Sequence, residues 1–285
     1  MLTIRTLEST SMSEIANTFN RAFSDYFVPF QVDQHYLYGR WKAARVDYSL
    51  SVGAFEEDEL VGFIIFGVDS VGGVMTAHNA ATGVVPECRG RRLVAMMYQT
   101  ALPLLRRAGV KRSTLEVITE NDKAIKAYAA AGYSVCRTLL CFAGSLTSSM
   151  GSAHEVQRSE SVFVDTPEGF SVYPQTWELS DEALRIAAND YECWYIAQEG
   201  DLTAFAVFNS ATGFVARLGF ADGVMEAYGP SLLAHIGAVA GHVKINNVDD
   251  TATELVSLLR NLGLKNPINQ YEMYMKLESS GAAAD

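Results

Sequence analysis

Residues 82–94 read TGVVPECRGRRLV and carry the most informative local pattern in the chain. A strand-like stretch ends at Pro86, a basic turn follows, and apolar residues at helical spacing begin directly after it. The first N–H groups of a helix have no acceptor within it and lie at the positive end of its dipole, so this turn predicts an anion site. Arg89, Arg91 and Arg92 add positive charge, although arginines near a helix start also occur on plain solvated surfaces. A pyrophosphate is the ligand that this combination favours.

The chain up to residue 145 alternates strand and helix patterns around this turn. A helix is expected after Ser11 or Ser13, and an acidic turn at 56–59 separates the two strands of an expected hairpin. The helix after the basic turn contains Pro103, which predicts a kink or the last turns of that helix. A strand (STLEVIT), a helix (NDKAIKAYAAAGY) and a closing strand follow.

The second half repeats the order of the first. Residues 146–161 are rich in Ser and Gly and are predicted to be a linker. Beyond it come a strand, an acidic turn, two strands, a helix expected to open at Gly229-Pro230, a strand, a helix and a strand. This recurrence predicts a tandem duplication, with domains 1–145 and 162–285, although a chance recurrence of a common α/β order is the alternative.

Composition limits the class of protein. The chain has 285 residues, enough for about two domains, and its 49% hydrophobic residues exclude a disordered chain. The longest apolar run, residues 60–68, is too short to span a bilayer, and the N-terminus lacks a signal pattern, so a cytoplasmic protein is expected. The four cysteines show no metal-binding spacing and are expected to be reduced thiols.

Charge is distributed unevenly between the two halves. Residues 1–145 carry 15 Lys and Arg against 14 Asp and Glu, whereas residues 146–285 carry 7 against 19. A pI near 4.9 argues against a nucleic-acid partner. The basic cluster around residues 89–112 is expected to hold a small polyanion instead.

Two motifs in order resemble those of the GNAT superfamily of acyl-CoA-dependent N-acyltransferases. The matching residues are Val84, Pro86, Arg89, Asn121, Ala124, Ile125, Tyr128, Gly132 and Tyr133. The resemblance covers residues 1–145 well and the second half only through its element order. It implies an α/β (α+β) fold of two tandem domains, each a mixed, mostly antiparallel central sheet flanked by helices, with the C-terminal copy degenerate.

The resemblance implies that acetyl-CoA is the acyl donor and that no metal takes part. It places the pantetheine arm along the backbone of Thr82, Gly83 and Val84, as an added strand, with Asn121 helping to fix the arm. The residues implied for the pyrophosphate are Arg89, Gly90, Arg91, Arg92, Leu93, Val94 and Ala95.

Two positions depart from the family pattern. Arg92 stands where the family has Gly, and Val94 stands where it has Gly or Ala. The side chain of Arg92 would crowd the pyrophosphate or, if it points outward, supply an extra phosphate contact. Binding is the expected outcome, because the rest of the loop and the later motif are intact.

Three residues are candidates for proton transfer. By resemblance Tyr128 would protonate the departing thiolate, although periodicity alone favours an ordinary packed helix tyrosine. Glu116, in the middle of a strand, is either the base that deprotonates the amine or a structural carboxylate. His78 is a second candidate base through its near-neutral pKa, although a lone strand histidine is more often structural. A water relay without a dedicated base is also open.

The second copy lacks these groups. Its residues opposite the base, the arm-binding and the acid positions are Asn247, Ala252 and Leu259. Its turn, residues 221–228, is acidic and would repel phosphates. One acetyl-CoA per chain is therefore expected.

The resemblance implies an N-acetyltransferase that moves an acetyl group from acetyl-CoA to a primary amine by direct attack in a ternary complex. The expected partner is a small-molecule amine, with a cationic amine preferred, and neither a nucleic acid nor a membrane is expected. The sequence is compatible with a monomer and with an oligomer. The alternative is a catalytically inactive CoA-binding or regulatory module.

Overall fold

The computed structural model describes residues 1–26, 31–146, 154–173 and 176–277 of the chain. The chain divides into two compact units. The first unit comprises Met1–Cys136 and the segment from Glu272 onward, and the second unit comprises Arg137–Tyr271. Within the described residues, no helix combines the length and apolarity that crossing a bilayer requires.

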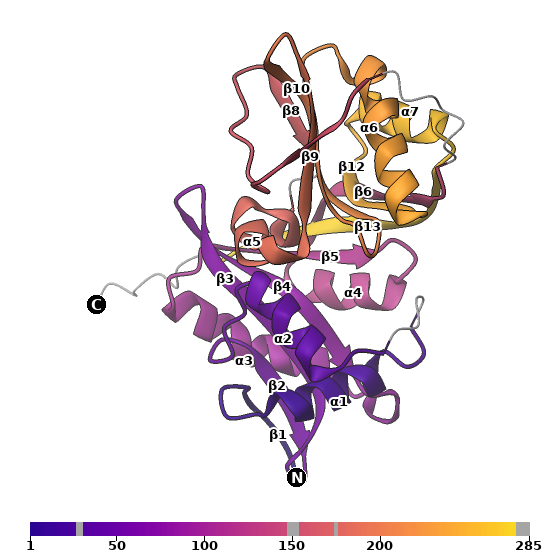
Figure 1. Ribbon diagram of the computed structural model, residues 1–285. Coiled ribbons are helices and arrows are strands. Elements are labelled where there is room, and N and C mark those ends of the chain that lie inside the picture. Colours follow the sequence, from indigo (N-terminus) through magenta and orange to yellow (C-terminus); the bar gives the residue numbers. More distant parts are fainter. Residues whose placement is uncertain (27–30, 147–153, 174–175, 278–285) are drawn as a thin grey trace. The chain divides into compact units, whose positions relative to one another are not determined.

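The first unit alternates strands and helices as the sequence predicts. Its elements are β1 (Leu2–Thr6), α1 (Met12–Ala22), α2 (Gln34–Ala43), β2 (Val52–Glu56), β3 (Glu59–Val71), β4 (Val74–Val84), the 3-10 turn η1 (Pro86–Cys88), α3 (Leu93–Arg107), β5 (Arg112–Ile118) and α4 (Asp122–Ala131). The strands lie in the order β1-β2-β3-β4-β5, and only the pair β4–β5 is parallel. Helix α1 packs on the face of the sheet that carries Phe63 and Ile65, whereas α3 packs through Tyr98 against Phe66 on the opposite face (Figure 1).

Local capping sets where the first two helices begin. Ser11, one of the two expected caps, accepts the Glu14 N–H at 3.1 Å at the start of α1. Helix α2 was not predicted, because its aromatic residues show no clear apolar face. Asp33 caps it by accepting the Tyr36 N–H at 2.7 Å, and Trp41 anchors it in the core at 1% exposure.

The second unit repeats the order of strands and helices of the first unit, except in the segments that precede β9. Its elements are β6 (Ser134–Gly144), β7 (Gln157–Ser159), β8 (Phe170–Tyr173), η2 (Trp177–Leu179), α5 (Asp181–Ile186), η3 (Ala188–Asp190), β9 (Glu192–Gln198), β10 (Asp201–Asn209), β11 (Phe214–Ala221), α6 (Met225–Ala240), β12 (Val243–Asp249), α7 (Thr253–Asn261) and β13 (Lys265–Lys276). The strands lie in the order β6-β12-β11-β10-β9-β7, and β8 pairs with β11.

Helix α6 begins earlier than predicted. It starts at Met225 rather than at Gly229-Pro230, because the N–H groups of Ala227 and Tyr228 already bond to the carbonyl of Val224. Pro230 therefore lies inside the helix, where it removes one backbone hydrogen bond.

The last strands of the two halves divide between the units. Strand β6 follows α4 in the sequence, yet from Arg137 onward it belongs to the second unit and pairs with β12. Strand β13 is divided in the opposite sense. From Glu272 onward it belongs to the first unit and lies beside β5. The N–H of Leu277 donates to Lys111 O at 2.8 Å. The units therefore do not coincide with the predicted ranges 1–145 and 162–285.

The predicted linker, 146–161, is only partly described. Residues 147–153 lie outside the described residues. The expectation is wrong at the C-terminal end of this segment, because β7 forms there and pairs with β9. Polar strand residues are common where only one edge is paired, and composition does not reveal this.

One bulge recurs at the same place in both units. The pairing of β3 with β4 skips Ala80, and the pairing of β10 with β11 skips Ala216. Beyond the bulge Gly83 lies opposite Phe63, and Gly219 lies opposite another phenylalanine. A Cβ on either glycine would come within 2.7 or 1.9 Å of the facing ring, so both positions require glycine. This shared detail supports the predicted duplication, and the predicted fold class is confirmed.

Candidate functional site

Strands β4 and β5 separate part-way along their length. Their parallel pairing runs from Thr76 to Asn79 on β4 and stops there, while β4 continues beside β3 to Val84. The bulge at Ala80 marks the point of separation. Among the described residues, no strand pairs with the second edge of β4 beyond that point. An extended, amide-bearing ligand therefore has a strand edge to join at residues 82–84.

The turn after β4 presents backbone N–H groups at the start of α3. Gly90 has φ +77°, and Arg92, the residue before the helix, has φ +59° and ψ 24°. The N–H groups of residues 93–95 precede the first helical bond, from Met96 N–H to Arg92 O at 3.1 Å. No acceptor for these three groups occurs in the described part of the chain. They lie at the positive end of the helix dipole, which suits a phosphate.

The guanidinium of Arg89 is engaged in other contacts and is not directed at the N–H groups of this turn. Its guanidinium donates to both carboxylate oxygens of Asp25, at 2.6 and 2.7 Å, and to the backbone oxygens of Ala22 and Val84. The hydrogen bonds from Arg89 hold the pKa of the Asp25 carboxyl below its usual range. Arg89 therefore ties the turn to the end of α1, and this use competes with the phosphate role predicted for its side chain.

Arg91 is also paired, whereas Arg92 lies exposed. Arg91 donates to both carboxylate oxygens of Glu56 at 2.9 Å and thereby lowers the pKa of that carboxyl. These pairings leave the backbone amides as the main anion donors of the turn. Positive φ at Arg92 means that the backbone adopts the conformation that the family's glycine would give.

Tyr128 lies next to the open edge of β4. It is 8% exposed on α4, a helix that starts where Asn121 accepts the Ala124 N–H at 3.2 Å. Burial raises the pKa of Tyr128, and a hydrogen bond with Thr82 opposes that rise. The structure thus brings two predicted site residues, Thr82 and Tyr128, into contact.

The side chain of Asn121 has two local partners. Its oxygen caps α4, and it also hydrogen-bonds to Tyr26, whose pKa is raised by burial and lowered by that bond. The predicted contact of Asn121 with the cofactor arm stays a prediction.

The two candidate bases lie in different surroundings. His78 is 2% exposed in the paired part of β4, and its Nδ1 lies 3.0 Å from Thr114 Oγ1. Glu116 lies on β5 immediately beyond Leu115, the last residue paired with β4, and is half-buried. Glu116 therefore lies where β4 and β5 separate, whereas His78 lies within the paired part of these two strands.

Residues 13–133 match the model of the acetyltransferase (GNAT) family. This stretch of the first unit is therefore similar to the acetyltransferase domains of the GNAT family. No curated protein sequence matches the chain.

Solved structures share the GNAT fold over nearly the whole chain. A GCN5-related N-acetyltransferase from Sphaerobacter thermophilus matches with a TM-score of 0.67 and 13% identity, covering 97% of this chain and 96% of that one. A tandem GNAT protein from the clavulanic acid biosynthesis pathway, solved without AcCoA, matches with a TM-score of 0.66 and 13% identity, covering 98% and 100%. A GCN5-related N-acetyltransferase from Kribbella flavida matches at 0.57 and 18% identity, covering 96% and 70%. At these low sequence identities, the similarity to the solved structures shows a shared fold and no more.

In the second GNAT-like unit the corresponding strand edge is occupied. Beyond its bulge, residues 218–221 of β11 pair with β8, in the register Leu218–Tyr173 to Ala221–Phe170. These positions correspond to residues 82–85 of the first unit, because both sets begin two residues after the residue that the strand pairing skips. The N–H of Asp222, in the turn before α6, already donates to Gly169 O at 2.9 Å.

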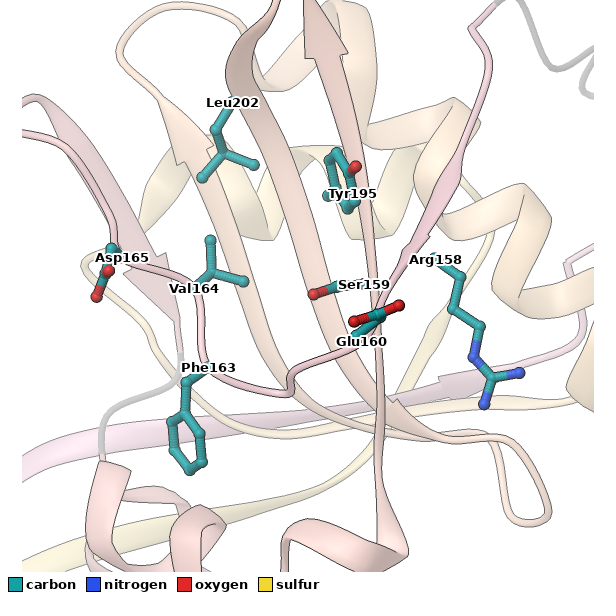
Figure 2. Close-up of a pocket in the computed structure, with 8 residues that line it drawn as sticks. All are labelled: Arg158, Ser159, Glu160, Phe163, Val164, Asp165, Tyr195 and Leu202. Atoms are coloured by element: carbon teal, nitrogen blue, oxygen red, sulfur yellow. The ribbon is translucent and has the colours of Figure 1, made fainter.

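A hollow of about 430 Å³ lies elsewhere in the second unit. Figure 2 shows the side chains around it, which come from β7 and the segment after it, from β9 and from β10. The lining residues are Arg158, Ser159, Glu160, Phe163, Val164, Asp165, Tyr195 and Leu202. None of them is a predicted site residue of the GNAT domain, and no group of three metal-binding side chains occurs in the described residues.

Sequence reasoning missed the residues that surround Thr82. Asn79 lies 2.8 Å from Thr82 Oγ1 and 2.7 Å from the Tyr98 hydroxyl, and both Asn79 and Tyr98 are buried. Neither is among the residues that match the two GNAT motifs. An asparagine inside an apolar strand was the available signal, because a buried amide requires polar partners.

Proposed function

We propose that the first unit transfers an acetyl group from acetyl-CoA to a primary amine by direct attack in a ternary complex. The observation that carries the proposal is the contact of Tyr128 with Thr82 at the open edge of β4. An acid candidate there lies close to the strand edge that suits an extended amide chain and to the helix start that suits a phosphate.

Acetyl-CoA fits the groups that the unit offers. The backbone at residues 82–84 would pair with the amides of the pantetheine arm, and the N–H groups of residues 93–95 would hold the pyrophosphate. The thioester supplies an acetyl group on a thiol leaving group. Because the two arginines next to Gly90 are paired with carboxylates, phosphate affinity would come chiefly from the backbone.

Proton transfer is assigned to two residues of the unit. Tyr128 would protonate the departing thiolate, a role in which a general acid contributes roughly 10²–10⁴-fold. Glu116 is the favoured base, because it lies where the strands separate, whereas His78 is buried and bonded to Thr114. Glu116 would take the proton of the attacking amine, directly or through water.

The acceptor is proposed to be a small cationic amine. Tyr36 and Tyr38 on α2 are 53% and 58% exposed and offer ring faces to a cation, whereas Trp41 of the same stretch belongs to the core. Residues 27–30 lie outside the described residues. The 19 acidic residues after position 145 would attract a cation, so kcat/KM is expected to fall as ionic strength rises.

A titration followed by a turnover assay tests this function. Acetyl-CoA is titrated by calorimetry, and thiol release is then measured with a panel of primary amines. Binding with amine-dependent thiol release is the expected result. Binding without thiol release from any amine would support the inactive CoA-binding module instead.

A further inference from the structure

A chain of polar side chains runs through the core of the first unit and ends at Tyr128. Asn79 donates from Nδ2 to Thr82 Oγ1 at 2.8 Å and to the Tyr98 hydroxyl at 2.7 Å. Thr82 in turn contacts Tyr128. On the other side the Tyr98 hydroxyl bonds to that of Tyr133, which lies 2.7 Å from Ser113 Oγ. The three tyrosine rings pack edge to face, with centroids 5.8–6.4 Å apart.

The bulge in β4 creates the central link of this chain. Side chains alternate along a strand, so residues 79 and 82 would normally lie on opposite faces. The extra residue, Ala80, reverses that alternation and brings Asn79 and Thr82 onto one face. The two side chains then bond twice, since the Thr82 hydroxyl also donates to Asn79 Oδ1 at 3.0 Å.

The second unit shows that the fold does not require this polar chain. At the register positions of Asn79 and Thr82 it has Val215 and Leu218. At the positions of Tyr128 and Tyr133, counted from the helix caps, it has Leu259 and Leu264. All four are at most 4% exposed. A buried polar network brings no general advantage in stability over apolar packing, so its presence in the first unit alone points to a role in function.

We propose that Asn79 and Tyr98 are positioning residues that act through Thr82 to orient the hydroxyl of Tyr128 and to stabilise its phenolate. This inference rests on the function proposed above. Thr82 has a single hydroxyl proton, which it can donate to Asn79 Oδ1 or to the oxygen of Tyr128. Because Asn79 Nδ2 keeps donating to Thr82 Oγ1, Thr82 stays in place when its proton turns toward Tyr128.

Acetyl transfer would consume the hydroxyl proton of Tyr128. The amine nitrogen forms the bond to the carbonyl carbon, the carbon–sulfur bond breaks, and the thiolate takes the Tyr128 proton. Tyr128 is left as a phenolate, which accepts the hydrogen bond of Thr82. Glu116 takes the proton that the amine nitrogen loses and releases it to solvent, and solvent returns a proton to Tyr128, so no further reactant is needed. Without Thr82, the buried phenolate would lack a donor, and burial already disfavours it.

Variants that remove single hydroxyls test the proposal kinetically. Thr82→Val is expected to lower kcat about 10-fold or more, within the range of a general-acid effect, while the KM for acetyl-CoA stays nearly unchanged. Thr82→Ser should restore most of kcat, and Tyr98→Phe should cause a smaller loss than Thr82→Val. Thr18→Val is the matched control: Thr18 is a buried threonine of the same unit, and among the described residues its hydroxyl bonds to the carbonyls of Glu14 and Leu60.

Two further measurements separate positioning from plain structural support. With an acetyl thioester of a more acidic thiol, the loss caused by Thr82→Val should shrink, because the leaving group needs less protonation. In the Tyr128→Phe background, Thr82→Val should have no additional effect on kcat. An equal loss with both leaving groups, or additive losses in the double variant, would overturn the proposal.

The link is also measurable without turnover. With ¹³Cζ-labelled tyrosine, Tyr98→Phe should shift the NMR signal of Tyr128 in the free protein, and this shift should vanish in a Thr82→Val background. Absence of the shift would overturn the network whatever the activity. If the NMR shift is observed but Tyr128→Phe keeps full activity, Tyr128 is not the general acid. The catalytic role proposed for the chain of polar side chains would then be overturned as well.

Discussion

Arg89 holds both carboxylate oxygens of Asp25, at 2.6 and 2.7 Å, and so joins the turn before α3 to the end of α1. Arg89 also donates to the carbonyl of Val84, the last residue of β4. The arginine of the family motif therefore has a supporting role in shaping the anion loop. Its partners lie 5 to 67 residues away in the sequence.

The pH dependence of stability reports on this ion pair. The pKa of Asp25 is lower in the folded protein than in the unfolded chain, so the pair stabilises the fold above about pH 4 and is lost as the pH falls through the folded pKa. Between about pH 5 and pH 3, the urea midpoint of the wild type should fall more than that of Asp25→Asn. Equal decreases in the two proteins would show that the pair does not contribute.

Replacing Arg92 by glycine tests the left-handed backbone of the loop. A non-glycine residue in this region costs about 1–2 kcal/mol, and the greater freedom of unfolded glycine offsets about 0.5–1 kcal/mol of the gain. Arg92→Gly should therefore be as stable as the wild type or up to about 1.5 kcal/mol more stable in urea unfolding. Gly90→Ala, at φ +77° with open space around the added Cβ, should be destabilised through the backbone alone. A clear loss of stability in Arg92→Gly would contradict this account.

Gly83 is expected to tolerate no side chain. A Cβ there would lie 2.7 Å from Phe63 Cζ and 3.0 Å from Ala22 Cβ, so Gly83→Ala should cost about 1–3 kcal/mol. Gly39→Ala is the matched control, because Gly39 lies in the middle of α2 with nothing within 4 Å. That control should gain about 0.5–1 kcal/mol from the helix propensity of alanine. Thermal unfolding of the two variants measures both effects.

Hydrogen exchange locates the cofactor in one unit. Acetyl-CoA should slow amide exchange at residues 82–84 and 93–95, where the described chain offers unpaired groups. Residues 218–221 should exchange slowly already and should not change, because β8 pairs with them. Calorimetry should give one site per chain. New protection at residues 218–221, or two sites, would show that acetyl-CoA displaces β8.

The sequence predicted much of the fold. Element order and the hairpin around residues 56–59 follow from periodicity. The two motifs marked Thr82 and Tyr128 as candidate site residues, and the structure brings the two side chains into contact, while their roles stay predictions. The division of β6 and β13 between the units does not follow, because a strand's residue pattern does not name its neighbour. For the same reason the composition of residues 146–161 predicts a linker where β7 forms.

The sequence does not reveal the hydrogen bonds and ion pairs around the candidate site, because they depend on the folded chain. The bond between Asn79 and Thr82 depends on a bulge that reverses side-chain alternation, and no residue type marks that bulge in the sequence. The pairing of Arg89 and Arg91 with Asp25 and Glu56 depends on long-range packing. Charge counting along the chain therefore overstated the free positive charge of the loop.

Turnover by Tyr128→Phe tests the central claim most directly. The substitution keeps the buried ring and removes only the proton donor, so any loss belongs to the transition state rather than to binding. With acetyl-CoA and a good amine acceptor, kcat should fall by roughly 10²–10⁴-fold while acetyl-CoA affinity, measured by calorimetry, stays nearly unchanged. An unchanged kcat would contradict the account and leave Tyr128 as a packed helix residue.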